Sequence, residues 1–235
     1  MKVLVLGSNG FVGTNLTLYL RKRGFETIDI DVSSPAFIRT DITKKELLFD
    51  DLEEVEFDAV IHLASITNIR DTIENPYRCY DVNCIGTLNV LELASQKGVK
   101  RLIYASSANV YGLPLELPVN ETTPFNPRAP YDYSKVISEY LVESYHKHKG
   151  VPTTILRSWK IFGEHDSPQS AISNFIKSCL RNEPISLFNL GRDTTDPYHV
   201  ENYCYAVELC LMKNEAVDEA FNVGTGNELS IRQIA

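Results

Sequence analysis

The chain has 235 residues, of which 43% are hydrophobic and 23% charged, so it can bury one substantial core and is neither disordered nor collagen-like. A formal charge of −8 makes it a poor general binder of phosphate backbones, so we expect no nucleic-acid partner. Its apolar runs are too short to cross a membrane, and Met1-Lys2 enters the first of them without a signal-peptide layout. We therefore expect no membrane association and a cytoplasmic location.

Short β-type runs alternate with helical patterns, which is typical of a parallel sheet covered by helices. The predicted strands are residues 2–6, 27–30, 36–39, 59–62, 101–105, 153–156 and 220–223. The predicted helices lie near residues 12–23, 44–51, 77–96, 134–148, 171–181 and 201–212. Because only a short connection separates the second and third strands, we expect a loop around Pro35 in place of a crossover helix.

A glycine-rich stretch, Gly7-Ser8-Asn9-Gly10-Phe11-Val12-Gly13, follows the first strand and opens the first helix. Glycines here permit a tight turn, a close approach of the backbone to a pyrophosphate, and close packing of helix on strand. The helix N-terminus adds free N–H groups and partial positive charge. We therefore predict a dinucleotide site that includes Gly7, Asn9, Gly10, Phe11, Val12 and Gly13.

An acidic residue ends the second strand. Asp31 lies where a carboxylate can accept hydrogen bonds from the adenosine ribose and repel a 2′-phosphate, so the sequence predicts NAD rather than NADP. The alternative is a solvated turn aspartate. Asp41 and Ile42 follow the third strand and could bracket the adenine ring, although Asp41 could equally cap the next helix.

Three further stretches fall at the carboxyl ends of predicted strands, where open parallel sheets bind ligands. They are His62-Leu63-Ala64-Ser65, the stretch 104–112 with Ala105, Ser106 and Ser107, and Pro130-Tyr131-Asp132-Tyr133-Ser134-Lys135. Tyr131 and Lys135 are four residues apart and share one helix face. A neighbouring ammonium lowers the pKa of a phenol, so Tyr131 is a candidate acid/base and Ser107 a partner that orients the same substrate oxygen.

With these pieces in order, the sequence resembles the extended short-chain dehydrogenase/reductase family, in its NAD-dependent sugar epimerase/dehydratase branch. The resemblance covers nearly the whole chain and extends to Asn75-Pro76, Asn83 with Gly86-Thr87, Glu121, Leu156-Arg157, His199-Val200 and the stretch 221–226. It implies a Rossmann-type doubly wound α/β sheet. It also implies NAD contacts from Leu63, Ala64, Ser65, Asn83, Ala105, Ser106, Tyr131 and Lys135.

A change in composition after Arg157 divides the chain. We expect an NAD-binding domain over residues 1–159, with a returning strand near 220–223, and a partial substrate-binding lobe over 160–235. Family members normally continue through a further helical segment, so the end at Ala235 implies a truncated chain or an open site. In the family, the helices containing residues 83–96 and 134–148 form a four-helix interface, which implies a homodimer.

The resemblance implies hydride transfer on a nucleotide-linked sugar, with Tyr131, Lys135 and Ser107 as catalytic residues and Ser106, Ser107, Tyr131 and Lys160 against the substrate. Ala108-Asn109 stands where family dehydratases place an Asp-Glu pair, which argues against dehydration. Lys160 stands where the family has a phosphate-binding asparagine, and it is either a replacement for the lost charge or a plain surface lysine. Thr195 stands where the family often has a phosphate-binding arginine, for which Arg192 could substitute only if the loop has an insertion. We therefore predict a nucleotide-sugar 4-epimerase, with a 4-dehydrogenase/reductase or a non-catalytic NAD-binding module as alternatives.

The five cysteines and five histidines carry no metal-binding pattern. Their spacing contains no Cys-x-x-Cys pair, and they are scattered along the chain. We expect free, partly buried thiols and no metal site.

Overall fold

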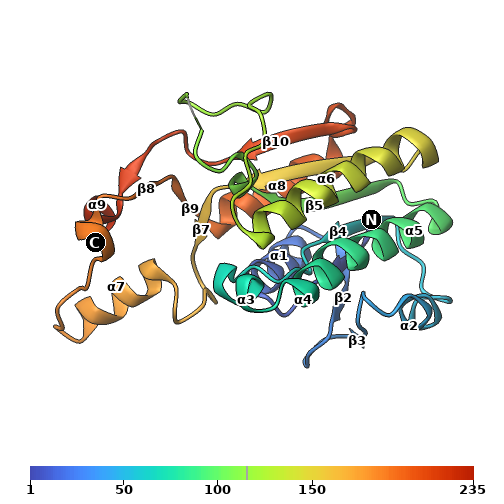
Figure 1. The fold of residues 1–235 in the computed structure, drawn as a ribbon. Helices are drawn as coiled ribbons and strands as arrows, with labels where there is room; N and C mark the ends of the chain where they lie inside the picture. Colours follow the sequence, from blue (N-terminus) through green and yellow to red (C-terminus); the bar gives the residue numbers. More distant parts are fainter. Residues whose placement is uncertain (115) are drawn as a thin grey trace.

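The computed structural model describes residues 1–114 and 116–235, which form an open sheet with helices on both faces (Figure 1). The seven strands follow the order β10-β6-β5-β4-β1-β2-β3, and each neighbouring pair is parallel. The strand order reverses between β1 and β4, which is the topological switch point of doubly wound folds. The predicted Rossmann-type fold class is therefore confirmed.

All seven predicted strands are present in this sheet. They are β1 (Lys2–Leu6), β2 (Glu26–Asp31), β3 (Ile38–Arg39), β4 (Ala59–His62), β5 (Arg101–Ser107), β6 (Thr153–Ser158) and β10 (Glu219–Val223). The helices are α1 (Phe11–Lys22), α2 (Lys45–Asp51), α3 (Ile69–Glu74), α4 (Pro76–Tyr80), α5 (Gly86–Lys97), α6 (Pro130–Lys149), α7 (Ala171–Leu180), α8 (Val200–Met212) and α9 (Ile231–Ile234). As expected, the connection from β2 to β3 is a loop.

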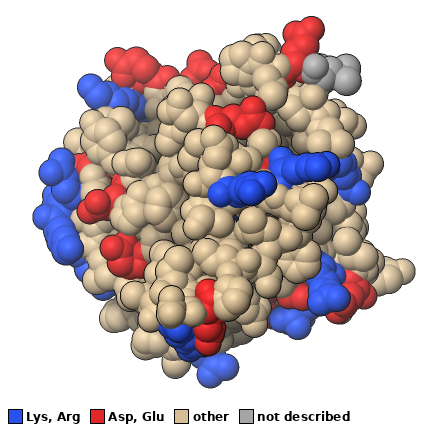
Figure 2. Space-filling model, turned by 90° about the vertical axis from the view of Figure 1, so that its left-hand side faces the viewer, with Lys and Arg blue, Asp and Glu red and all other residues tan. Residues whose placement is uncertain are grey.

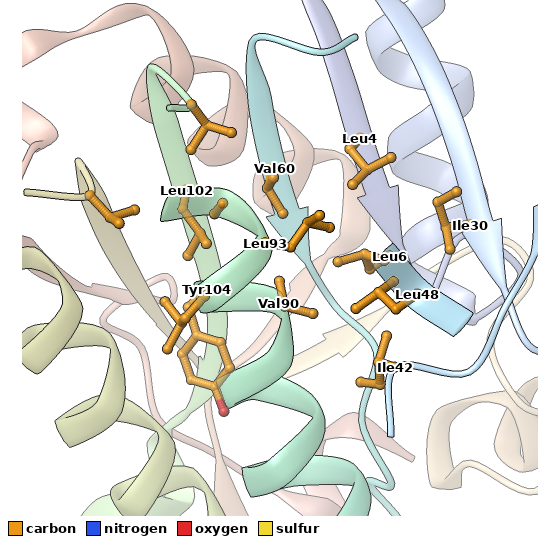
Figure 3. Close-up of a cluster of buried hydrophobic side chains, with 14 of the residues drawn as sticks. Leu4, Leu6, Ile30, Ile42, Leu48, Val60, Val90, Leu93, Leu102 and Tyr104 are labelled. Atoms are coloured by element: carbon orange, nitrogen blue, oxygen red, sulfur yellow. The ribbon is translucent and has the colours of Figure 1, made fainter. Parts of the chain in front are cut away.

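Alternate residues of each strand enter opposite halves of the core, because successive side chains of a strand point to opposite faces. Leu4 and Leu6 pack with residues of α2, α5 and α6 (Figure 3). Val3 and Val5 pack on the other face with residues of α1 and α8. Both faces of the central part of the sheet are therefore buried, which explains why β1 and β4 read as nearly continuous apolar runs.

The helix predicted over residues 77–96 is divided into three parts. Between α4 and α5 the chain widens into a π-helical turn, η1 (Asp81–Ile85). Such wide turns insert an extra residue into a helix and are frequent at functional sites. Here the turn brings Asn83 into contact with the loop that follows β4.

Helix α6 starts four residues earlier than the predicted helix at 134. Pro130 occupies its first turn, where a missing N–H costs no helical hydrogen bond. The Asp132 carboxylate accepts hydrogen bonds from the backbone N–H groups of Arg128 and Ala129, both at 3.0 Å. This cap allows the helix to include Tyr131 in its first turn.

After β6 the chain forms smaller units. β7 (Lys160–Phe162) pairs in parallel with β9 (Pro197–His199), and β8 (Thr194–Thr195) pairs antiparallel with β11 (Leu229–Ser230). These pairs, α7, α9 and the short turn η3 (Phe188–Gly191) make up what we call the small lobe, residues 160–199 and 224–235. In Figure 1 α7, α9 and β8 lie to one side of the main sheet.

Candidate active site

A cavity of about 660 Å³ lies at the carboxyl ends of β1, β4, β5 and β6, between the main sheet and the small lobe. Its lining includes the predicted residues Gly7, Gly10, Phe11, Val12, Gly13, Leu63, Ser65, Ala105, Ser106, Ser107, Tyr131, Lys135 and Lys160. The structure therefore brings the glycine loop, the tyrosine–lysine pair and the small lobe to one site, as expected for an open parallel sheet.

The glycine loop has no room for side chains at two of its positions. A Cβ at Gly13 would lie 2.1 Å from the carbonyl oxygen of Gly7, and Gly7 itself has a φ of +86°. Gly10 is the N-cap of α1 and provides no side-chain cap, so the first N–H groups of the helix have no helical partner. This loop fits a pyrophosphate, because Phe11, Val12 and Gly13 in the first turn of α1 line the cavity and the N–H groups of a first helical turn are available to an anion.

Asp31 lies at the end of β2, beside the glycine loop. Its carboxylate accepts hydrogen bonds from the backbone N–H of Asn9 at 3.0 Å, the backbone N–H of Ser33 at 3.0 Å and the Ser33 hydroxyl at 2.8 Å. The side-chain amide of Asn9 also donates to the carbonyl oxygen of Ser33 at 2.6 Å. These contacts fix the carboxylate at the position where the sequence predicts a ribose contact.

Three predicted cofactor residues, Asp41, Ile42 and Ala64, are not among the residues that line the cavity. Asp41 accepts a hydrogen bond from the N–H of Thr43 at 2.9 Å, as in a turn. Ile42 is buried in the core, and its carbonyl oxygen accepts a hydrogen bond from the Asn89 amide at 2.8 Å. Ala64 contacts the glycine loop, since a Cβ at Gly7 would lie 2.7 Å from the Ala64 nitrogen.

Asn83 is fully enclosed in the wide turn and has structural partners on two sides. Its amide oxygen accepts from the N–H of Ile66 at 2.8 Å, and its amide nitrogen donates to the Ile66 carbonyl at 3.0 Å. The amide nitrogen also donates to the Ser134 hydroxyl at 2.9 Å, which donates in turn to the Tyr131 carbonyl. Asn83 thus ties the loop after β4 to the helix that carries the tyrosine.

The catalytic candidates Tyr131, Lys135 and Ser107 all line the cavity. Burial raises the pKa of Tyr131 to about 12, and a hydrogen bond with Ser107 acts against that rise. Burial lowers the pKa of Lys135 to about 8. Its Nζ donates to the Ala105 carbonyl at 2.7 Å and lies 5.8 Å from the centre of the Tyr131 ring.

The expectation that Lys135 lowers the pKa of Tyr131 is therefore wrong for the protein groups taken by themselves. Both side chains are buried, and the loss of water around the phenolate outweighs the hydrogen bond that stabilises it. Lys135 makes its closest contact with a backbone carbonyl instead of the phenol oxygen. Lowering the pKa of Tyr131 into the neutral range requires a further positive charge at the site.

Sequence reasoning missed part of the cavity wall. Thr67, Asn68, Ser158, Trp159, Asp166, Ser167, Gln169, Ser170 and Tyr203 also line it. Asn68 has a recognisable signal, since it caps α3 by accepting hydrogen bonds from the N–H groups of Arg70 and Asp71. Ser158 ends strand β6, and the others come from loops or from the distant helix α8, which no local spacing relates to the glycine loop.

Other site classes find no support in the part of the chain that the structure describes. Within residues 1–114 and 116–235, no group of three or more His, Cys, Asp or Glu side chains could hold a metal ion. The five cysteines are free thiols, as expected. Among the described helices none is both long and apolar enough to span a bilayer. A cytosolic location stays a prediction of the sequence.

The strand order, the glycine loop and the cavity at the switch point define a dinucleotide-binding α/β protein. Residues 3–224 match the model of the NAD-dependent epimerase/dehydratase family, and the chain belongs to this family. It is therefore an enzyme whose cofactor is NAD, as predicted.

Relatives in the family are named for more than one reaction. Over 99% of its length the chain is 33% identical to an inferred UDP-glucose 4-epimerase of Methanocaldococcus jannaschii, of which it covers 79%. It is 29% identical over its whole length to a dTDP-D-glucose 4,6-dehydratase of Dictyostelium discoideum and covers 60% of that protein. A UDP-glucose 4-epimerase of Thermotoga maritima, solved with UDP-glucose, matches the whole chain with a TM-score of 0.94 and 27% identity, and 80% of that structure is covered.

Proposed function

We propose that the protein is an NAD-dependent nucleotide-sugar 4-epimerase that acts by reversible hydride transfer at C4. The observation that carries this proposal is the convergence of Tyr131, Ser107 and Lys135 on the cavity that the glycine loop also lines. Residues 1–159, with the strand near 220–223, would hold NAD, and the segment 160–235 would hold part of the substrate. The names of the epimerase relatives support the same reading.

In this mechanism the protein holds the sugar and moves a proton. Tyr131 accepts the proton of the C4 hydroxyl on its phenol oxygen, and Ser107 donates a hydrogen bond to the same substrate oxygen. NAD, when bound, supplies the hydride acceptor and a positive charge close to the phenol. Lys135 would hold the nicotinamide ribose, and the positive charge of the bound nicotinamide would oppose the burial that raises the pKa of Tyr131.

The residues after Ser107 disfavour dehydration. Ala108 has no acid or base, and the Asn109 amide donates to an Asp132 oxygen at 3.2 Å. Asp132 is only 2% exposed, and its other oxygen accepts two backbone hydrogen bonds at the start of α6. The carboxylate of Asp132 therefore caps α6, and its hydrogen bonds leave it unsuited to proton transfer on a sugar.

A cation in the small lobe supports a phosphate-bearing substrate. Lys160 lines the cavity, and we propose that it contacts the diphosphate in place of the family's asparagine. Asp196 has another role: its carboxylate accepts hydrogen bonds from the N–H groups of Thr225 and Gly226, both at 2.8 Å. It therefore joins the turn at residues 224–226 to the segment just before β9 within the small lobe.

The central test replaces Tyr131 with phenylalanine and measures single-turnover reduction of bound NAD by UDP-glucose and by UDP-galactose. The variant keeps the ring, so folding and NAD binding should survive, while the rate should fall by roughly 10²–10⁴-fold. Tyr133→Phe is the matched control, because Tyr133 lies on the same helix and is 48% exposed. If Tyr131→Phe reduces NAD as fast as the unmodified enzyme, the assignment is wrong.

A second measurement separates epimerase from dehydrogenase. An epimerase interconverts the two sugars without added NAD and with no net change in nicotinamide absorbance, whereas a dehydrogenase or reductase accumulates reduced or oxidised cofactor. A protein that binds NAD but turns over neither sugar would fit the non-catalytic module instead.

We also propose that the enzyme is a homodimer. Helix α6 leaves an apolar stripe exposed, with Tyr133, Ile137 and Tyr140 at 48%, 42% and 57% exposure. These positions repeat at spacings of four and three residues and so share one face. Two copies of α5 and α6 around a two-fold axis would bury this stripe. A single monomeric species in sedimentation at micromolar concentration would contradict this arrangement.

A further inference from the structure

The inner face of α6 carries an acid that the proposed mechanism does not use. Tyr131, Lys135 and Glu139 are spaced four residues apart and therefore lie one above the other on the same side of the helix. All three are buried, with exposures of 8%, 3% and 0%. A fully buried carboxylate needs a reason to remain there, because its ionised form loses its hydration.

Glu139 is held in one orientation by its partners. Arg157 on β6 binds it with two nitrogens: Nη2 lies 2.6 Å from Oε2, and Nε lies 3.0 Å from Oε2 and 3.1 Å from Oε1. The Ser106 hydroxyl donates to Oε1. Ser106 precedes Ser107 on β5, so this carboxylate links the helix that carries Tyr131 to the strand that carries Ser107.

Arg157 is itself anchored away from the cavity. Its Nη1 donates to the Tyr111 hydroxyl at 2.8 Å and to the Glu121 carbonyl at 2.9 Å, and its guanidinium lies 4.9 Å from the centre of the Phe125 ring. The guanidinium therefore binds Glu139, the Tyr111 hydroxyl and the Glu121 carbonyl at the same time, which fixes the place of the carboxylate.

Lys135 has few groups that favour its charged form. Its Nζ contacts the Ala105 carbonyl and lies 4.9 Å from the centre of the Tyr104 ring. The titratable groups that face it come from β4, β5, α4, η1 and α6. They are His62, Tyr104, Cys79, Cys84, Tyr131 and Glu139.

Among these six titratable groups Glu139 is the carboxylate, the group that favours a positive charge on Lys135. Burial lowers the pKa of Lys135 to about 8, and the charge of Glu139 is the largest influence acting against the decrease. His62 is neutral near pH 7, because burial and the nearby Lys135 lower its pKa to about 3. The charge of Lys135 at neutral pH thus depends strongly on its neighbour one turn along the helix.

We propose that Glu139 is a positioning residue that keeps Lys135 protonated and fixes Ser106 beside the catalytic Ser107. The task given to Lys135, binding the nicotinamide ribose, rests on the proposed function. The coupling between Glu139 and Lys135 does not depend on it. The Arg157 contact holds the carboxylate in place, and Glu139 is the first of the charged groups that favour the protonated form of Lys135.

The test measures the pKa of Lys135 directly, by NMR of the full chain labelled with ¹³C at the lysine ε-carbon, with Lys135→Arg used to assign the signal. Glu139→Gln should lower the pKa of Lys135 by roughly one unit, the low end of the effect of a close charge. Glu143→Gln, which removes the same charge from an exposed position one turn further along α6, should leave it unchanged.

A double variant keeps the proposal testable if Glu139→Gln does not fold, because replacing both members of a buried pair is tolerated better than removing one. Glu139→Gln with Arg157→Met should also lower the pKa of Lys135. If the double variant leaves it unchanged, the field of an unpaired Arg157 explains the single variant and the proposal is wrong. An equal shift in Glu143→Gln would also overturn it.

The affinity for NAD provides a second readout, and measuring it requires no sugar substrate. With Glu139→Gln, the affinity for NAD should equal that of the unmodified protein near pH 6 and fall about one pH unit earlier as the pH rises. Loss of NAD affinity by the same factor at every pH would indicate a purely structural role for Glu139 and overturn the proposal. Because neither readout uses sugar turnover, failure here is distinguishable from failure of the proposed epimerase activity.

Discussion

The main sheet and the small lobe differ in the exposure of their side chains. The inner residues of β1 and β4 are fully enclosed, whereas α7 has no buried residue. In the small lobe Leu180 is 83% exposed and Phe188 is 91% exposed. In Figure 2, which views the side that carries this lobe, uncharged residues cover most of the surface.

This difference separates two tasks within one site. Tyr131, Lys135 and Ser107 are carried by a helix and a strand of the buried sheet, which hold reacting groups in place. The small lobe consists of loops, short strands and the exposed helix α7, and the Asn15 amide of α1 donates to its Glu164 carbonyl at 2.7 Å. Regions with little burial have low local stability and tolerate change, which suits them to setting specificity.

The largest expected contrast compares one leucine from each region. Leu4→Ala removes a fully buried side chain and should lower the free energy of unfolding by about 2–5 kcal/mol. Leu180→Ala, in the exposed face of α7, should change it by less than about 0.5 kcal/mol. Urea denaturation followed by circular dichroism measures both. A loss of several kcal/mol in Leu180→Ala would mean that α7 is covered in solution.

A smaller effect concerns the cofactor groove of the main sheet. Asp31→Ala should weaken NAD binding by about 1.5–3 kcal/mol, or roughly 10- to 100-fold, because hydrogen bonds to a charged group are lost. It should also improve tolerance of NADP. Asp31→Asn is the control that keeps the shape of the side chain beside Asn9 and Ser33 but removes the charge. Calorimetric titration with both cofactors measures the affinities, and equal NADP and NAD binding by the unmodified protein would contradict the role given to Asp31.

The last contrast is a pH dependence that a fully buried histidine gives to the main sheet. Burial, together with Lys135, lowers the pKa of His62 to about 3. Above about pH 6.5 the histidine is neutral in both the folded and the unfolded chain. As the pH falls below that value, His62 binds a proton in the unfolded chain but stays neutral in the folded chain. The free energy of unfolding therefore decreases between pH 6.5 and 3, by up to about 1.4 kcal/mol per pH unit.

The measurement compares unfolding free energies at about pH 7 and about pH 5, on either side of the ordinary histidine pKa, in two variants. His62→Gln should lose less stability over this interval than the unmodified protein, because that proton uptake is removed. His165→Gln changes an exposed histidine of the small lobe and should follow the unmodified protein. Parallel pH profiles for all three proteins would mean that His62 is protonated in the folded state.

Local patterns in the sequence are sufficient for the sheet and for the glycine loop. Short β-type runs identify all seven strands of the main sheet, and the central strands β1 and β4 are the most apolar because both of their faces are buried. The spacing of Gly7, Gly10 and Gly13 identifies the loop in which a Cβ at Gly13 cannot fit. The small lobe is harder to predict, because its strands are two or three residues long and carry no periodicity.

The four-residue spacing of Tyr131 and Lys135 is enough to place both on one helix face, because the helical period is a property of the backbone alone. The charges of these two side chains are decided by the tertiary structure. Burial raises the pKa of Tyr131 and lowers that of Lys135, against the effect expected from their proximity. Glu139 and Arg157 lie eighteen residues apart in the chain and meet only because α6 packs on β6. Desolvation and pairing of this kind depend on which elements come together, and that information is not contained in any local stretch of sequence.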